Sequence, residues 1–108
     1  MSAPREMRFT FLACADLRRI CDALSMPTDM WGVTAAENAA RAQAFAEKFA
    51  RHCELVAANP EMGADRQELL HGMRSSPFQK YVIFYRARGD AIEVVRVLRA
   101  RRDSELQA

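Results

Sequence analysis

Hydrophobic residues recur along the chain with two different periods, and the change of period separates strands from helices. Residues 7–12, MRFTFL, alternate as in a short strand, with Phe9 and Phe11 on the same side. The next segment, ACADLRRICDAL, repeats with the period of a helix and predicts about three amphipathic turns. Its apolar stripe comprises Ala13, Leu17, Ile20, Cys21 and Leu24.

A second, longer helix is predicted after a break at residues 25–32, SMPTDMWG, where Pro27 and Gly32 are both poor helix continuers. Thr34 or an adjacent residue is expected to cap this helix. It ends at Asn59-Pro60, because a residue that precedes proline is pushed out of the helical region. Its apolar stripe comprises Ala42, Phe45, Phe49, Cys53 and Val56.

Three β-rich runs, MRSSPF, KYVIFYR and AIEVVRVLR, follow a connector that has room for a short helical turn or strand. Gly89 and Asp90 supply a tight hairpin turn between the last two runs. The order β-α-α-β-β-β predicts an α+β fold, with a helical hairpin packed on one face of a mostly antiparallel small sheet. We expect a single domain over residues 1–108, with flexible tails at 1–7 and 104–108.

The last two strands are apolar on both faces, although a sheet covered by helices on one side needs only one apolar face. The pattern predicts that Ile92, Val94 and Leu98 point one way. Two further valines of this strand, Val95 and Val97, are expected to point the other way. The face without helices would then carry an apolar patch, which is typical of a partner site. The alternative is that a terminal segment of the chain folds over it.

Charge is distributed unevenly, although the net charge is only +2. Residues 1–65 hold 7 Lys/Arg and 9 Asp/Glu, whereas residues 66–102 hold 9 Lys/Arg and 3 Asp/Glu, a net +6. Such an excess of positive charge in the C-terminal third of the chain favours an acidic partner, either a protein segment or a nucleic acid. No apolar run approaches the roughly 20 residues of a membrane span, and no secretory signal is visible, so a cytoplasmic location is expected.

Metal or cofactor chemistry has little support in the sequence. The three cysteines, Cys14, Cys21 and Cys53, form no C-x-x-C pair, so a zinc site would have to combine them with His52. We expect the cysteines to be small apolar fillers of helices instead, and we predict no metal site and no cofactor.

Short motifs follow one another through the second half of the chain. They are NP-x-x-G at 59–63, R-x-E-L at 66–69, G-x-R-S-x-P at 72–77, Y-x-I-F-Y-R at 81–86, I-x-V-x-R-V-L at 92–98 and RRD at 101–103, with D-L-x-x-I upstream at 16–20. In this order they resemble the ParE branch of the RelE/ParE toxin superfamily. The chain departs from that pattern in three places: no Ser-Pro cap precedes the first helix, the segment between the helices is long, and Arg99 stands where a histidine is common.

The resemblance implies the toxin of a type II toxin–antitoxin module, a growth inhibitor that poisons DNA gyrase. It also implies a ParD-like antitoxin that forms a hetero-oligomeric complex with the toxin, and contact with DNA only through that antitoxin. We therefore expect no membrane partner and no catalytic residue. The residues that we expect to contact antitoxin or target are Trp31, Arg74, Tyr85, Arg86, Arg96, Arg99, Arg101 and Arg102. Among them Arg96 is expected to be desolvated, and Arg101 and Arg102 to lie at the rim. The alternatives are that Arg74 and Arg96 are satisfied by ion pairs within the chain, that the arginines at 99–102 form a solvated tail, and that Trp31 with Met30 packs the two helices together.

The alternative function is that of a ribosome-dependent mRNA endonuclease of the RelE type. Cleavage at a 2′-OH needs an acid and a base besides cations, but no His or Tyr follows Arg99. His52 and His71 are expected at surface or boundary positions, which leaves Tyr85 as the remaining candidate. We therefore expect an inhibitor rather than an enzyme, with a toxin-like scaffold acting on another target as a third reading.

Overall fold

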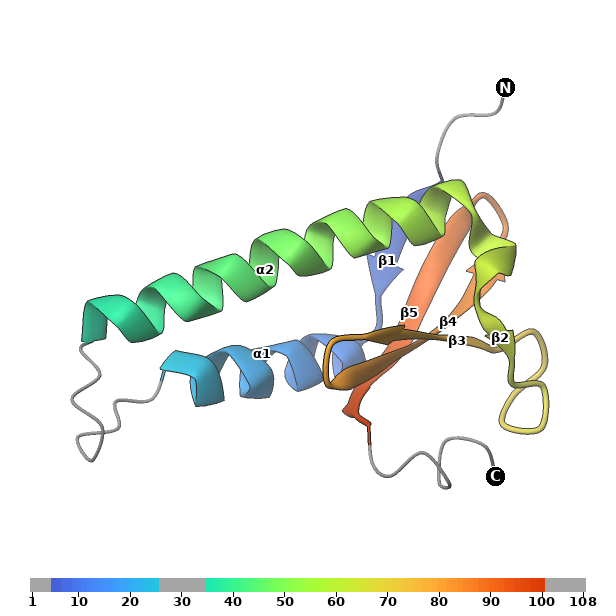
Figure 1. Cartoon of the computed structure of the whole chain (residues 1–108). Helices are drawn as coiled ribbons and strands as arrows, with labels where there is room; N and C mark the ends of the chain where they lie inside the picture. The colour runs from blue at the N-terminus through green and yellow to red at the C-terminus, as the bar shows by residue number, and fades with distance from the viewer. Residues whose placement is uncertain (1–4, 26–34, 101–108) are drawn as a thin grey trace.

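The computed structural model describes residues 5–25 and 35–100, which form two helices on one face of a five-stranded sheet (Figure 1). The predicted α+β class and the helical hairpin are confirmed. Trp31, Thr34, Arg101 and Arg102 lie outside the described residues, so the expectations made for them have no structural counterpart here. The elements are β1 (Glu6–Phe9), α1 (Phe11–Ser25), α2 (Ala35–Ala58), η2 (Pro60–Met62), β2 (Ala64–Asp65), β3 (Arg74–Phe78), β4 (Tyr81–Arg88) and β5 (Ala91–Arg99).

The junction between β1 and α1 differs from the sequence prediction. The strand stops at Phe9, and Thr10 caps the helix, because the Ala13 amide donates to Thr10 Oγ1 at 3.0 Å. Phe11 therefore belongs to the first helical turn and is 86% exposed, whereas Phe9 packs against the core. The expectation that both phenylalanines share a strand face was wrong, because the alternating run continues past the cap.

The sheet has the order β1-β5-β4-β3-β2. Strand β1 runs parallel to β5, and the other neighbouring strands are antiparallel, as predicted for a mostly antiparallel sheet. Gly89 and Asp90 form the turn between β4 and β5, where Gly89 has a φ of +58°, a value that glycine adopts without strain.

A β-bulge in β5 changes which side chains face the helices. Phe84 pairs with Arg96, whereas its neighbour Tyr85 pairs with Val94, so the residue between, Val95, has no partner on β4. The extra residue reverses the alternation, and Val97 joins Val94 in the core at 2% exposure, whereas Leu98 is 38% exposed. The predicted faces of Val97 and Leu98 were therefore wrong, because strict alternation cannot anticipate a bulge.

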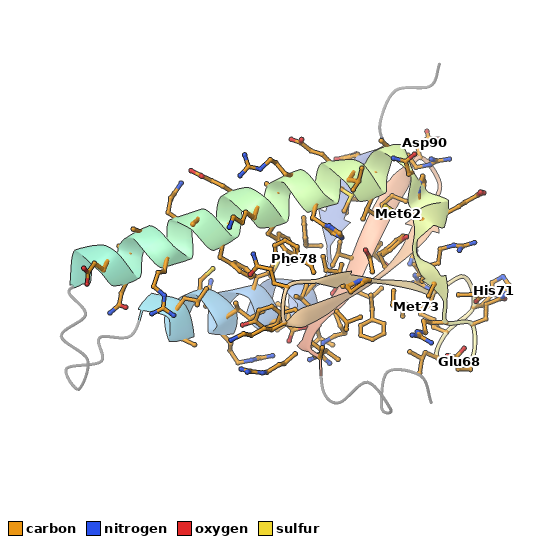
Figure 2. All side chains as sticks on the ribbon, viewed as in Figure 1. Met62, Glu68, His71, Met73, Phe78 and Asp90 are labelled. Carbon is orange, nitrogen blue, oxygen red and sulfur yellow. The ribbon has the colours of Figure 1, made fainter. Side chains whose placement is uncertain are left out.

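The core lies between the two helices and the sheet. Both predicted helical stripes face it, and an aromatic cluster fills its centre, where the Phe45 and Phe49 rings meet the Phe78 ring edge-on at 5.5 and 5.6 Å between centroids. Phe78 lies between α2 and the sheet in Figure 2. The same figure shows Glu68 and His71 at the tip of the connector between β2 and β3, far from the place where α1 ends and α2 begins.

Candidate partner-binding surfaces

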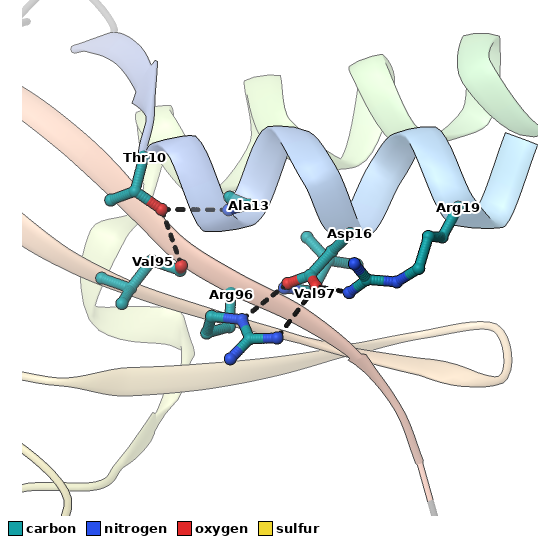
Figure 3. Close-up of polar contacts among 7 residues, drawn as sticks. All are labelled: Thr10, Ala13, Asp16, Arg19, Val95, Arg96 and Val97. Carbon is teal, nitrogen blue, oxygen red and sulfur yellow. Dashed lines mark hydrogen bonds and ion pairs between the residues drawn. The ribbon is translucent and has the colours of Figure 1, made fainter.

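Arg96 is held by the fold through an ion pair with Asp16 of α1. Its Nε and Nη2 donate to the two carboxylate oxygens of Asp16 at 2.8 and 2.9 Å (Figure 3). The amide of Val97 donates to the same carboxylate at 3.0 Å, and Arg19 pairs with it from one helical turn further on. The side chain of Asp16 is 1% exposed and that of Arg96 is 35% exposed. The Arg96 hydrogen bonds hold the pKa of Asp16 below its ordinary value.

The contacts between Asp16 and β5, called the Asp16 junction below, lie at an edge of the sheet that would otherwise have unpaired backbone groups. Because β1 ends opposite Val94, no strand among the described residues flanks the continuation of β5 on that side. Thr10 Oγ1 donates to the Val95 carbonyl at 2.8 Å, and Asp16 accepts from the Val97 amide. Side chains of α1 thus take the place of a strand and satisfy backbone groups that would otherwise invite edge pairing.

Tyr85 fastens the opposite end of the sheet to the segment that follows α2. Its hydroxyl donates to the Pro60 carbonyl at 2.7 Å and accepts from the Gly63 amide at 3.0 Å. A Cβ on Gly63 would lie 2.3 Å from that hydroxyl, so only glycine permits the approach. The side chain is 1% exposed, and burial raises its pKa. The motif NP-x-x-G and the second tyrosine of Y-x-I-F-Y-R are therefore two halves of one contact.

Two further arginines on the list of expected contact residues also have partners within the chain. Arg74, which pairs with Tyr85 across the strands, donates through Nη1 to the carbonyls of Gly63 and Glu61 at 2.9 and 3.4 Å. Arg86 donates to Glu93 at 3.0 Å, and both side chains are partly exposed. Arg74 and Tyr85 therefore lie together at one end of the sheet.

The sheet face turned away from the helices, called the far face below, is apolar with basic members. The register places Phe84 beside Arg96, and Val82 beside Leu98, on this face. Val82 is buried and Phe84 is half-buried, whereas Leu98 is 38% exposed. The accessible apolar area of the far face thus consists of Leu98 and part of Phe84, with Arg86 and Arg96 on the same face.

Arg99 lies at the end of β5 and is exposed, facing Tyr81 across the strands. It contributes to a groove of about 520 Å³ between the C-terminal end of α1, the middle of α2 and the β3–β4 turn. A second hollow, of about 670 Å³, lies beside Tyr85 and Arg74 at the other end of the sheet. Those expected contact residues that the structure describes are thus divided among three places rather than gathered in one site.

Sequence reasoning missed Asp16, Gly63 and Thr10 as organisers of these surfaces. Asp16 and Gly63 do belong to recognised motifs, but the residues that they contact are 80 and 22 positions away along the chain. Thr10 is a good capping residue that precedes an apolar helical run, and that local signal was available.

The histidines and cysteines do not form a metal site within residues 5–25 and 35–100. His52 Nε2 lies 2.8 Å from Ser76 Oγ, its ring packs beside that of Phe78 at 5.3 Å between centroids, and burial lowers its pKa. The cysteines are unpaired, and burial raises the pKa of Cys53 to about 11. No helix in the described part of the chain is long and apolar enough to span a membrane.

Comparison with known proteins identifies one family. A family model described as the ParE toxin of type II toxin–antitoxin system, parDE, matches residues 8–104. Among solved structures, the fold is similar to a chain from the chromosomal ParDE toxin–antitoxin system of P. aeruginosa. That match has a TM-score of 0.68 and 19% sequence identity, and it covers 93% of this chain and 100% of the other. No curated protein sequence matches.

Proposed function

The chain belongs to the family of ParE toxins of type II toxin–antitoxin systems, and on that premise we propose that it inhibits DNA gyrase in the cytoplasm and is neutralised by a ParD-like antitoxin. The proposal has two parts, a mode of action without catalysis and a binding surface for the antitoxin. Each rests on different residues and has its own test.

The observation that carries the mode of action is the burial of Tyr85. A general acid or base must reach the proton that it transfers. The hydroxyl of Tyr85 is instead occupied by the Pro60 carbonyl and the Gly63 amide, and the side chain is 1% exposed. The residue that sequence reasoning left as the best catalyst thus has a structural role, which supports inhibition through binding.

The far face supports the second part. A flexible antitoxin segment that folds on binding can cover a large apolar surface. Leu98 and Phe84 offer such a surface, and Arg96 keeps 35% of its side chain exposed although it is paired with Asp16. The exposed part of Arg96 could therefore bind an antitoxin carboxylate while the side chain stays paired with Asp16. Arg86 could do the same while it stays paired with Glu93.

The mode of action is tested with the purified toxin in a DNA gyrase supercoiling assay, run beside a cleavage assay on mRNA in programmed ribosomes. We expect supercoiling to be inhibited and the mRNA to stay intact. Tyr85→Phe should still inhibit in proportion to its folded fraction, because it keeps the ring and removes only the hydroxyl. Cleavage within ribosome-bound codons with normal supercoiling would instead identify a RelE-type endonuclease.

The antitoxin surface is tested with the protein encoded beside the toxin gene. We expect Leu98→Asp to raise the dissociation rate at least ~10-fold, because it places an unpaired charge in an apolar contact. Arg51→Asp, on the exposed side of α2, is the matched control and should bind like the wild type. Equal kinetics for the two variants, both folded by circular dichroism, would place the antitoxin elsewhere.

A further inference from the structure

The hollow of about 670 Å³ beside Tyr85, called the Tyr85 hollow below, lies where the end of α2 meets the sheet. Its volume is in the range of about 300 to 1,000 Å³ that is usual for small-molecule sites. Three charged side chains line it: Arg5 just before β1, Glu61 of η2 and Arg74 at the start of β3. The Tyr85 hollow is distinct from the far face, because Tyr85 belongs to the core on the helix-covered side of the sheet.

The guanidinium of Arg74 is fixed on one edge and free on the other. Nη1 donates to the carbonyls of Gly63 and Glu61 at 2.9 and 3.4 Å. Within residues 5–25 and 35–100, Nε and Nη2 make no hydrogen bond or ion pair, and Asp65, which faces Arg74 from β2, is bonded to Gln67 instead. The Nε–Nη2 edge is the part of an arginine that binds two oxygens of a phosphate or carboxylate side by side. Because the backbone already holds the side chain, an anion that binds there costs little further ordering.

Arg5 supplies a second cation to the same hollow. Its backbone amide donates to the Ala57 carbonyl at 3.3 Å, which holds the residue beside the end of α2. Its side chain is exposed and has no ion pair in the described part of the chain. Two guanidinium groups at one hollow favour an anionic ligand.

Two features of the Tyr85 hollow work against a bare anion. Glu61 brings an exposed carboxylate, and α2 ends there, so the negative end of the helix dipole lies close by. A ligand that carries hydroxyl groups beside its anionic group can donate to Glu61, as ribose hydroxyls do to acidic residues in dinucleotide sites. Pro60 and Met62 add an apolar wall, and Met62 is 45% exposed just beyond the end of α2 (Figure 2).

We propose that the Tyr85 hollow binds a hydroxyl-bearing phosphate ester, the chemistry that nucleotides and sugar phosphates share. The phosphate binds the Nε–Nη2 edge of Arg74 and the guanidinium of Arg5, and the hydroxyl groups donate to Glu61. A base, where the ligand has one, packs on the wall of Pro60 and Met62. This inference does not depend on the gyrase proposal or on the occupant of the far face.

The test is isothermal titration calorimetry of the full chain with ADP, ribose 5-phosphate, pyrophosphate and adenosine. We expect ADP to bind at least about 10-fold more tightly than pyrophosphate, which has a similar charge but no hydroxyl groups, and adenosine, which has no phosphate, not to bind. Ribose 5-phosphate separates the two sources: binding equal to that of ADP identifies a sugar-phosphate site, and weaker binding identifies a nucleotide site. Amide shifts of the 15N-labelled protein should locate ADP at Met62, Gly72 and Ala87, which line the hollow.

Three variants test the role given to each charged side chain. Arg5→Ala should weaken ADP binding about 10-fold, whereas the matched control Arg18→Ala, which removes an exposed arginine of α1 outside the hollow, should stay within about twofold of the wild type. Arg74→Lys keeps the charge but loses the two-nitrogen edge, and should also weaken ADP binding about 10-fold. Glu61→Gln should tighten pyrophosphate binding and reduce the advantage of ADP over pyrophosphate to about twofold or less, because it removes the repulsion and the charged acceptor together.

Four results would overturn the proposal. They are no saturable binding of ADP or ribose 5-phosphate, equal Kd values for Arg5→Ala and Arg18→Ala, an advantage of ADP over pyrophosphate that Glu61→Gln leaves unchanged, and amide shifts confined to the far face. Arg5 and Glu61 are exposed, so their variants are expected to fold, and circular dichroism checks that they do. The Arg5 and Glu61 variants therefore decide the question even where Arg74→Lys, which alters the bonds to Gly63 and Glu61, does not fold.

Discussion

Arg96 and Arg99 lie three residues apart on β5, yet Arg96 is bonded within the fold and Arg99 is exposed at the surface. Arg96 reaches Asp16 with two hydrogen bonds, whereas Arg99 lines the groove beside the β3–β4 turn without an ion pair in the described chain. The same contrast divides the other cations: Arg74 and Arg86 have internal partners, and Arg41, Lys48 and Lys80 have none there. A count of basic residues along a sequence therefore overstates the charge available to a partner.

The largest expected effect comes from separating the two arginines of β5. Arg96→Ala should lower the free energy of unfolding by about 3 kcal/mol, because it leaves a buried carboxylate with less compensation. Arg99→Ala should change it by less than about 0.5 kcal/mol. Urea denaturation of both variants measures the difference, and similar midpoints would show that the Asp16 junction is not stabilising.

The contact of Tyr85 with the segment after α2 is expected to rank second. Tyr85→Phe removes the donor to the Pro60 carbonyl and leaves the Gly63 amide unpaired, which should cost about 2 kcal/mol. Because the proposed role is structural, growth inhibition should fall only as far as the folded fraction falls. Abolished inhibition in a protein that remains folded would restore Tyr85 as a catalytic candidate.

Lowering the pH should reproduce part of the loss of unfolding free energy that we expect for Arg96→Ala. The pKa of Asp16 is lowered in the folded state from an ordinary 3.8, so its contribution is present above that value and is lost as the pH falls through the folded pKa. Thermal unfolding from pH 6 to pH 2 should therefore show a steeper decline for the wild type than for Asp16→Asn. Parallel curves would mean that another carboxylate controls acid unfolding.

The smallest expected effect is at the partly exposed pair of Arg86 and Glu93. Arg86→Ala should cost about 0.5 kcal/mol, and the cost should shrink in high salt, as is usual for exposed ion pairs. Measuring the unfolding free energy at low and high NaCl tests this. A loss as large as that of Arg96→Ala, unchanged by salt, would erase the distinction between the buried junction and the surface pairs.

The sequence by itself determined the order of the elements and most of the core. The stripes of α1 and α2 face the sheet as their period predicted, because burial of an apolar stripe is the main stabilisation available to an amphipathic helix. The position of the β4–β5 turn also followed from local chemistry, since Gly89 needs a positive φ that few other residues tolerate. Such features depend on neighbours within a few positions.

Only the tertiary structure decided which polar residues remain available. Asp16 takes Arg96 from a distance of 80 positions, and Tyr85 bonds Gly63 and Pro60 across more than 20 positions. The bulge at Val95 likewise arises from pairing between strands, and it alone moved Val97 into the core and Leu98 out of it. Hydrogen bonds and ion pairs between distant residues depend on how the elements pack. The periodicity of the sequence therefore predicts which faces of the helices and strands are apolar, but not which polar residues bond to one another.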